Sequence, residues 1–270
     1  MESVKAASKK TIPIQRGSFK SKYLRKHASL LQESSRGLLI STLVREETRA
    51  LGQARTLLET YFLELFPDAI PQWKSETEKD VDESFINAKM PMQAPNDPAT
   101  TETNSRKDRF FQAVDTACSG VIFIRFKSNI SPLDFMTAFI KHSEQMDEQT
   151  RKDLAHSIRY CHRFVPIEFI CPSYLPEIIS NVPVFLHEKW PQIQPNETVA
   201  LLTEIRNSTT QKQDVIDSIA KMFPEELKIN LSNPKWTILV SIFKSCCGVS
   251  VLPNYKMNAK YNLRALLQKA

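Results

Sequence analysis

The most regular apolar pattern in the chain lies in residues 46–66 and predicts an amphipathic helix. Apolar residues recur there at steps of three or one, which places them on one face of a helix. They are Ala50, Leu51, Ala54, Leu57, Leu58, Tyr61, Phe62, Leu65 and Phe66. Glu46 and Glu47 occupy the first turn, where the helix dipole favours negative charge, and Pro67 ends the helix. This helix is therefore the second element of the first folded unit, after a short strand.

Apolar runs around this helix predict the other elements of that unit. Residues 38–44 form a buried strand before the helix, and residues 110–115 and 121–126 form two strands joined by a turn. A second helix begins at Pro132. If residues 157–167 are extended, the order is strand, helix, strand, strand, helix, strand, which is the ferredoxin-like pattern.

Two arginines in residues 157–167 are candidates for phosphate contact. In an extended strand Arg159 and Arg163 share one face and lie about 13 Å apart. Guanidinium groups suit nucleic-acid phosphates because they present a planar fork of donors and keep their charge. The alternative is an edge strand with solvated arginines. Residues 147–156 before them are expected to be a polar helical turn or a loop.

Two stretches have few apolar residues, and we expect both to be disordered. Residues 1–35 form a basic arm: residues 1–27 alone carry a balance of +7, against +6 for the whole chain. This arm is a solvated tail, a nucleic-acid tether or a nuclear-import signal. Residues 71–108 form an acidic, proline-containing insertion. Residues 105–270 carry +5, which favours RNA or DNA as a partner.

From Pro172 onward the chain predicts a second, smaller α/β unit. Its expected elements are helices at 174–190 interrupted at Pro183, a strand at 198–205, a helix at 211–223, and strands at 228–231, 236–243 and 249–252.

Several classes of protein are excluded by the absence of their motifs. The five glycines are too far apart for a nucleotide-binding G-x-G-x-x-G or a phosphate loop, so no cofactor is expected. Neither G-x-S-x-G nor the zinc-deaminase signature occurs, so no catalytic residue is assigned. The five cysteines include no C-x-x-C, so we expect buried thiols and no metal. No apolar run approaches 18 residues, so we expect a soluble intracellular protein without membrane contact.

An ordered set of motifs resembles the THUMP-domain proteins over residues 36–269. The set is R-x-x-x-R-x-x-P (Arg159, Arg163, Pro166), then Glu204-Ile205-Arg206-Asn207, K-I-N-L-x-N-P at 228–234, C-C-x-x-S-V at 246–251 and K-Y-N-L at 260–263. With the K-Y-N-L tail, the set resembles the stand-alone adaptor branch that assists N(4)-acetylcytidine formation in tRNA.

The resemblance implies an α/β (α+β) chain of four parts without a catalytic domain. They are a disordered basic arm at 1–35, an N-terminal ferredoxin-like domain at 36–167 with the disordered insertion 71–108, a THUMP domain at 168–254 and a C-terminal tail at 255–270. The expected role is a tRNA-binding adaptor and not an enzyme. It would present serine and leucine tRNAs to a separate RNA cytidine acetyltransferase, which modifies the D-arm. The THUMP domain would lie near the tRNA 3′ end. The basic arm favours the nucleus or the nucleolus.

Eight residues are the candidates for RNA contact: Arg159, Arg163, Arg206, Asn207, Lys235, Lys244, Lys256 and Lys260. Alternatives stay open for each kind of residue. Arg206 and Asn207 can form a capped turn, and lysines are often only solvated. Tyr255 and Tyr261 either stack on bases or pack against the sheet. The alternative functions are a general RNA-binding ribosome-biogenesis factor and a small RNA-modifying enzyme that uses acids and histidines.

Overall fold

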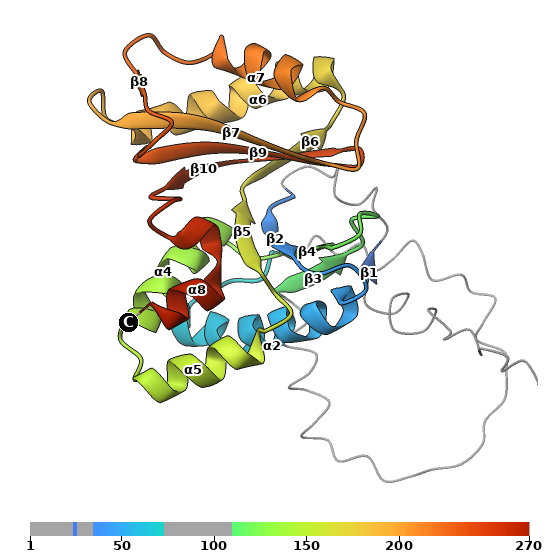
Figure 1. Cartoon of the computed structure of the whole chain (residues 1–270), viewed down its shortest axis with the longest axis vertical. Coiled ribbons are helices and arrows are strands. Elements are labelled where there is room, and N and C mark those ends of the chain that lie inside the picture. Colours follow the sequence, from blue (N-terminus) through green and yellow to red (C-terminus); the bar gives the residue numbers. More distant parts are fainter. Residues whose placement is uncertain (1–23, 26–34, 73–109, 270) are drawn as a thin grey trace, which may run out of the picture.

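The computed structural model describes residues 24–25, 35–72 and 110–269. It contains two five-stranded sheets, each with helices packed against it (Figure 1). The predicted insertion 71–108 lies almost wholly outside the described residues, as does most of the predicted basic arm. Two residues of that arm, Leu24–Arg25, form the short strand β1, so the expectation of disorder was wrong for them.

The first sheet has the strand order β1-β3-β4-β2-β5. Its other strands are β2 (Gly37–Ser41), β3 (Phe111–Val114), β4 (Val121–Phe126) and β5 (Arg163–Ile167). Its helices are α2 (Glu47–Leu65), α4 (Pro132–Glu144) and α5 (Glu148–Ser157). Without β1, the antiparallel order β3-β4-β2-β5 is that of the predicted ferredoxin-like unit, which the structure confirms.

The apolar face predicted for residues 46–66 builds the core of this unit. Ala50, Leu58 and Phe62 of α2 are buried. The Phe62 ring lies 5.2 Å from the ring of Phe110 and 5.9 Å from that of Phe135. Aromatic rings at this spacing attract one another and contribute more than their buried area alone. The apolar residues whose spacing predicted this helix are therefore the ones that pack it against the sheet.

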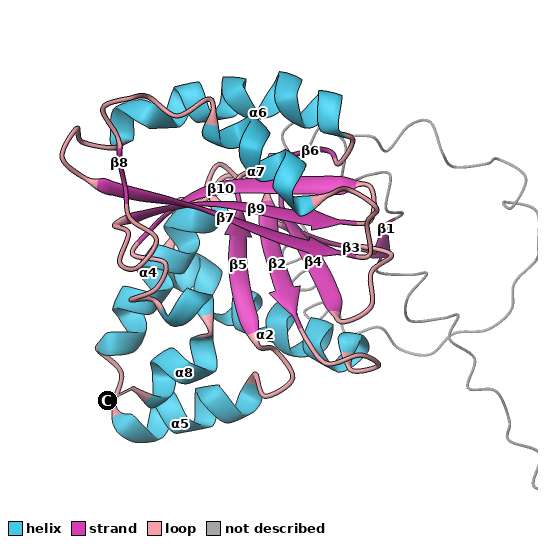
Figure 2. Ribbon diagram, turned by 45° about the horizontal axis from the view of Figure 1, so that its top comes forward, coloured by secondary structure: helices cyan, strands magenta, loops and turns pink. Residues whose placement is uncertain are grey.

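The second sheet has the strand order β6-β10-β9-β7-β8. Its strands are β6 (Phe169–Pro172), β7 (Thr198–Arg206), β8 (Lys228–Ile229), β9 (Trp236–Phe243) and β10 (Cys246–Pro253). Its helices are α6 (Leu175–Lys189), η3 (Trp190–Gln192) and α7 (Lys212–Ala220). Helices α6 and α7 pack over one face of this sheet (Figure 2).

The two sheets are joined by a nearly continuous strand and a shared core. Only Glu168 separates β5 from β6, and its carboxylate pairs with Lys189 at 2.6 Å. Leu239 and Phe243 of β9 and Leu252 of β10 belong to the core of the first unit. One face of the second sheet is therefore buried against the first unit, and the other against its own helices.

Residues 255–270 were predicted as a tail, but residues 255–267 add side chains to the first core. Here η4 (Ala259–Tyr261) precedes α8 (Leu263–Gln268). Tyr255, Tyr261, Leu263 and Leu267 are buried there. Apolar and aromatic side chains in this short segment explain why it docks instead of remaining in solvent.

Several predicted boundaries were wrong. The strand expected at 38–44 ends at Ser41, and Leu43 and Val44 are exposed at 61% and 62%. Residues 147–156 form most of the regular helix α5. The two helices expected around Pro183 are one helix, because a continuous buried face runs through it: Ile178, Val182, Phe185 and Leu186. The final strand begins at Cys246 instead of 249, and β6 was not predicted.

The expectation that residues 157–167 are extended was wrong for residues 157–162, because β5 begins only at Arg163. The preceding turn is held down by buried groups. Ile158 and Cys161 are fully buried, and the Cys161 thiol donates a hydrogen bond to the Ala50 carbonyl at 3.3 Å. Arg159 and Arg163 therefore do not share the strand face predicted for them.

Candidate RNA-binding surface

Three of the predicted residues meet at one edge of the second sheet. Arg206 ends β7, Asn207 follows it, and Lys244 follows β9. The strands are parallel and Arg206 is opposite Phe243, so the register brings the two strand ends together. The Lys244 amide donates to the Arg206 carbonyl at 3.2 Å. Asn207 and Lys244 both have positive φ, at 51° and 55°, so the chain turns sharply away from the sheet here.

An open groove of about 760 Å³ lies at this edge. Its lining includes Asn207 and Lys244. The Thr210 hydroxyl donates to the Ser173 carbonyl at 3.1 Å, which fixes one wall. Tyr174 lies on the rim and is 69% exposed. The groove combines cationic, amide, hydroxyl and aromatic groups, and its volume is within the range of small-molecule sites.

Arg206 and Lys244 form no ion pair with any other residue that the structure describes. Their positive field reaches the loop before β4. Burial raises the pKa of the Cys118 thiol there, while Arg206 and Lys244 act to lower it. Two neighbouring cations, one of them lining the groove, that pair with no carboxylate in the described part of the chain form a site ready for an anion.

Lys235 and Lys256 lie at the opposite end of the second sheet, and the ammonium group of each already contacts other groups of the protein. The Lys235 ammonium pairs with the Glu197 carboxylate. The Lys256 ammonium donates to the carbonyls of Leu231 at 2.7 Å and Ser232 at 2.6 Å. The length of β9 puts Lys235 about 30 Å from Lys244. The eight predicted residues therefore do not form one patch. Lys260, in η4, is exposed and belongs to neither group.

Arg163 connects the two units through an ion pair. Its Nη1 lies 3.2 Å from Glu204 Oε1 of β7, and both side chains are about one third exposed (34% and 33%). The buried Tyr255 is close enough to sense both charges. Burial first and Glu204 second raise its pKa to about 12, while Arg163 acts to lower it. Arg163 is therefore partly neutralised within the protein.

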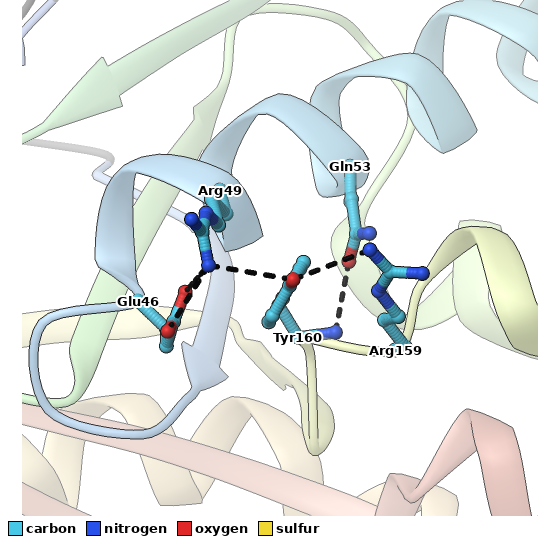
Figure 3. Close-up of polar contacts among 5 residues, drawn as sticks. All are labelled: Glu46, Arg49, Gln53, Arg159 and Tyr160. Carbon is cyan, nitrogen blue, oxygen red and sulfur yellow. Dashed lines mark hydrogen bonds and ion pairs between the residues drawn. The ribbon is translucent and has the colours of Figure 1, made fainter.

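Arg159 lies apart from the other predicted residues, beside an arginine that the sequence analysis missed. The guanidiniums of Arg159 and Arg49 lie 4.9 Å and 5.3 Å from the centre of the Tyr160 ring (Figure 3). Arg49 is on the polar face of α2, where arginines are common, so no sequence signal distinguished it. Tyr255 and Tyr261 are each 1% exposed, which favours packing over base stacking.

The fold and this surface define an α/β protein whose second unit is a THUMP domain, and residues 175–252 match the THUMP domain family. This match lies inside the predicted range 168–254 and extends from α6 into β10. THUMP domain proteins bind RNA and work in tRNA modification. Among the described residues, no helix has the length and apolar content needed to span a membrane, and no three His, Cys, Asp or Glu side chains cluster as metal ligands.

The chain is similar to THUMP domain-containing protein 1 from mammals, and the names of these relatives state no enzyme activity. It is 28% identical to the Bos taurus protein over 249 residues, covering 89% of this chain and 65% of that protein. Identity to the Homo sapiens protein is 27% over 246 residues, covering 88% and 65%. The chain thus spans about two thirds of the length of these relatives, 65% in both cases.

Two solved structures show a looser likeness. A Pyrococcus horikoshii protein gives a TM-score of 0.37 at 8% identity, covering 82% of this chain and 56% of that one. A 4-thiouridine synthetase, solved as an RNA complex with bound ATP, gives a TM-score of 0.30 at 14% identity, covering 62% and 40%.

Proposed function

We propose that this protein is a tRNA-binding adaptor that presents serine and leucine tRNAs to a separate RNA cytidine acetyltransferase. That enzyme, and not this chain, would form N(4)-acetylcytidine in the D-arm, with the nucleus or nucleolus as the place of action. The observation that carries RNA binding is the meeting of Arg206, Asn207 and Lys244 at one end of β7 and β9, where Asn207 and Lys244 line a groove and Arg206 precedes it in the chain. The client tRNAs and the acetyltransferase rest on the resemblance to the adaptor branch.

The chemistry of the groove suits a single-stranded RNA end. Arg206, next to the groove residue Asn207, offers a fork of donors to phosphate oxygens, and Lys244 adds a point charge in the groove itself. Asn207 and the nearby hydroxyls can donate to sugars or bases. The exposed ring of Tyr174 suits stacking by an unpaired base. A tRNA 3′ terminus provides phosphates and unpaired bases together, so we assign it to this groove.

The binding step is tested by replacing Arg206 and Lys244, for which the described residues provide no ion-pair partner. We expect Arg206→Ala with Lys244→Ala to lower tRNA affinity at least about tenfold, because two phosphate-binding side chains are removed. The measurement is a gel shift with intact tRNA and with tRNA lacking its terminal CCA, across a salt series. Wild type should prefer the intact end, and the variant should lose this preference.

The matched control is Lys141→Ala with Lys152→Ala, which removes the same charge from α4 and α5. This control should keep the preference for the intact end. Equal weakening by both pairs would mean that RNA senses only net charge, and the assignment of the groove would then be wrong.

The adaptor role is tested with a purified RNA cytidine acetyltransferase, acetyl-CoA and serine tRNA. Acetylcytidine should form only when both proteins are present. Product from the isolated chain would instead support the small-enzyme alternative. An equal preference for ribosomal RNA fragments in a competition assay would support the ribosome-biogenesis alternative.

A further inference from the structure

A second groove lies on the first unit, between α2 and the turn after α5. It has a volume of about 550 Å³ and shares no lining residue with the groove of the THUMP domain. Its α2 wall follows the helix repeat at Arg49, Gly52, Gln53 and Thr56. The opposite wall consists of Ser157, Arg159 and Tyr160.

The arginines of this groove are held in place by Tyr160. Arg49 Nη1 and Arg159 Nη2 lie 3.4 Å and 3.3 Å from the Tyr160 hydroxyl oxygen, one on either side of it (Figure 3). Gln53 accepts a hydrogen bond from the Tyr160 amide at 2.9 Å, which ties the turn to α2. Cation–π contact with the ring reduces the freedom of both guanidiniums. Donors that are already oriented lose less entropy when a ligand binds.

Gly52 gives the second, independent observation. It lies inside α2, where glycine is less stable than alanine. Packing does not require it, since a Cβ at this position would meet no atom within 4 Å. A locally unfavourable residue without a structural benefit is typical of a functional site. A glycine in a groove wall lets a ligand approach the helix backbone closely.

The charge of the groove is positive on balance. Glu46 pairs with Arg49 at 3.1 Å from the edge, and His156 Nε2 lies 3.0 Å from Arg159 Nη1. Arg264 of α8 approaches from behind, with its Nη1 3.4 Å from the Arg159 carbonyl oxygen. The two arginines of the groove thus stand against one carboxylate, which favours an anion with several acceptor oxygens.

We infer that this groove binds a backbone phosphodiester of RNA, with Arg49 and Arg159 as donors and the bare backbone at Gly52 leaving room for the ribose. The inference rests on the proposed function and adds a second contact, on the ferredoxin-like unit, for the same RNA. Arg49, Gly52 and Tyr160 are thereby assigned to RNA binding.

The direct test fills the groove without changing its charge, by Gly52→Gln. We expect tRNA affinity to fall about tenfold, the cost of removing one charge-assisted hydrogen bond, while the melting temperature stays equal or rises. The matched control, Thr60→Gln, adds the same side chain to an exposed position of α2 outside the groove and should change neither value. Unchanged affinity in Gly52→Gln would overturn the inference.

A second readout separates this inference from the proposed function. A short single-stranded RNA oligonucleotide should shift the NMR signals of the Gln53 and Tyr160 amides in wild type, and not in Gly52→Gln. This result would support the groove even if the preference for an intact tRNA end failed. No shift at these amides would refute it, whatever the other groove does. A shift with inorganic phosphate and none with RNA would mean a free phosphorylated ligand and would also refute the RNA assignment.

Discussion

Several ionisable side chains are buried in forms that carry no charge. Burial raises the pKa of Cys161 to about 12, and burial with the neighbouring Cys171 raises that of Cys246 to about 12. The pKa of Tyr255 is likewise raised to about 12, by burial first and by Glu204 second. Removing water disfavours a thiolate or phenolate, so these groups stay protonated at neutral pH. They therefore pack as apolar side chains and are poor nucleophiles.

These raised pKa values predict a loss of stability in alkali. In the unfolded chain a cysteine ionises near pH 8.5, whereas Cys161 and Cys246 in the folded chain hold their protons to about pH 12. The folded state therefore binds protons more tightly. Its advantage is complete below about pH 8.5 and is lost as the pH rises toward 12. Urea unfolding at pH 7, 8.5 and 10 should show a falling free energy of unfolding.

The matched control for this prediction is Cys161→Ala, which removes one of the buried thiols. Its free energy of unfolding should start lower, because a buried group is lost, and should fall less between pH 8.5 and 10. A free energy that is flat over this interval in wild type would show that the thiols ionise as easily inside the protein as outside.

At the scale of elements, α8 closes the first unit. Leu263 and Leu267 are buried against its core, and the helix begins with the Asn262 side chain accepting from the Ala265 amide at 3.2 Å. It also positions Arg264 beside the turn that carries Arg159. The last residues of this chain thus support the groove proposed on the first unit.

Truncating a buried leucine of α8 should destabilise the protein. We expect Leu263→Ala, at a position 1% exposed, to cost about 2–5 kcal/mol, because it leaves a cavity in the shared core. Leu231→Ala makes the same chemical change where the side chain is 69% exposed, so it should cost less than about 1 kcal/mol. Thermal unfolding of both variants measures the difference. Equal destabilisation would mean that α8 does not pack as described.

Periodic elements were predictable from the sequence, and elements fixed by distant contacts were not. The helix predicted at 46–66 is α2, because its apolar face is visible in its own residues. Strand β6 is four residues long, and its pairing with β10 depends on residues 246–249. The turn at 158–162 likewise depends on Ala50 and Gln53, about one hundred residues earlier (|i−j| of 111 and 107). Local pattern carries no information about such partners.

The same limit applies to the candidate site. Arg206 and Asn207 were chosen from their position after a strand, and Lys244 from its charge. Only the parallel register of β7 and β9 shows that the three residues lie together. The register also shows that Lys235 is at the far end, paired with Glu197. Whether a cation is paired within the protein depends on its neighbours in space. The sequence could therefore suggest candidate residues but could not show which of them lie together or are already paired.

On the scale of the whole molecule, the shared core holds the two units together. Leu239 and Leu252 of the second sheet are buried in the first unit, and the Arg163–Glu204 ion pair joins β5 to β7. An ion pair that is one third exposed adds little stability, so the apolar contact is the main connection. The two grooves are therefore held in a fixed relative position, and an RNA can contact both without first ordering a linker.

The uneven charge of the chain predicts different roles for the arm and the grooves in binding tRNA. Residues 1–27 carry a balance of +7 and the whole chain carries +6, so the remaining residues are nearly neutral. We expect deletion of residues 1–22, which stops before β1, to weaken tRNA binding and to make it less sensitive to salt. Each phosphate-binding lysine or arginine that the deletion removes should reduce the slope of log affinity against log salt by about one.

The weakening should be equal for tRNA with and without its terminal CCA, because a phosphate contact carries no information about the 3′ end. Arg206→Ala with Lys244→Ala should behave in the opposite way, with a smaller change of slope and a loss of preference. Gel shifts of wild type, deletion and double variant over the same salt series compare the three. If the deletion abolished the preference, the arm would recognise the 3′ end, and the groove of the THUMP domain would only add charge.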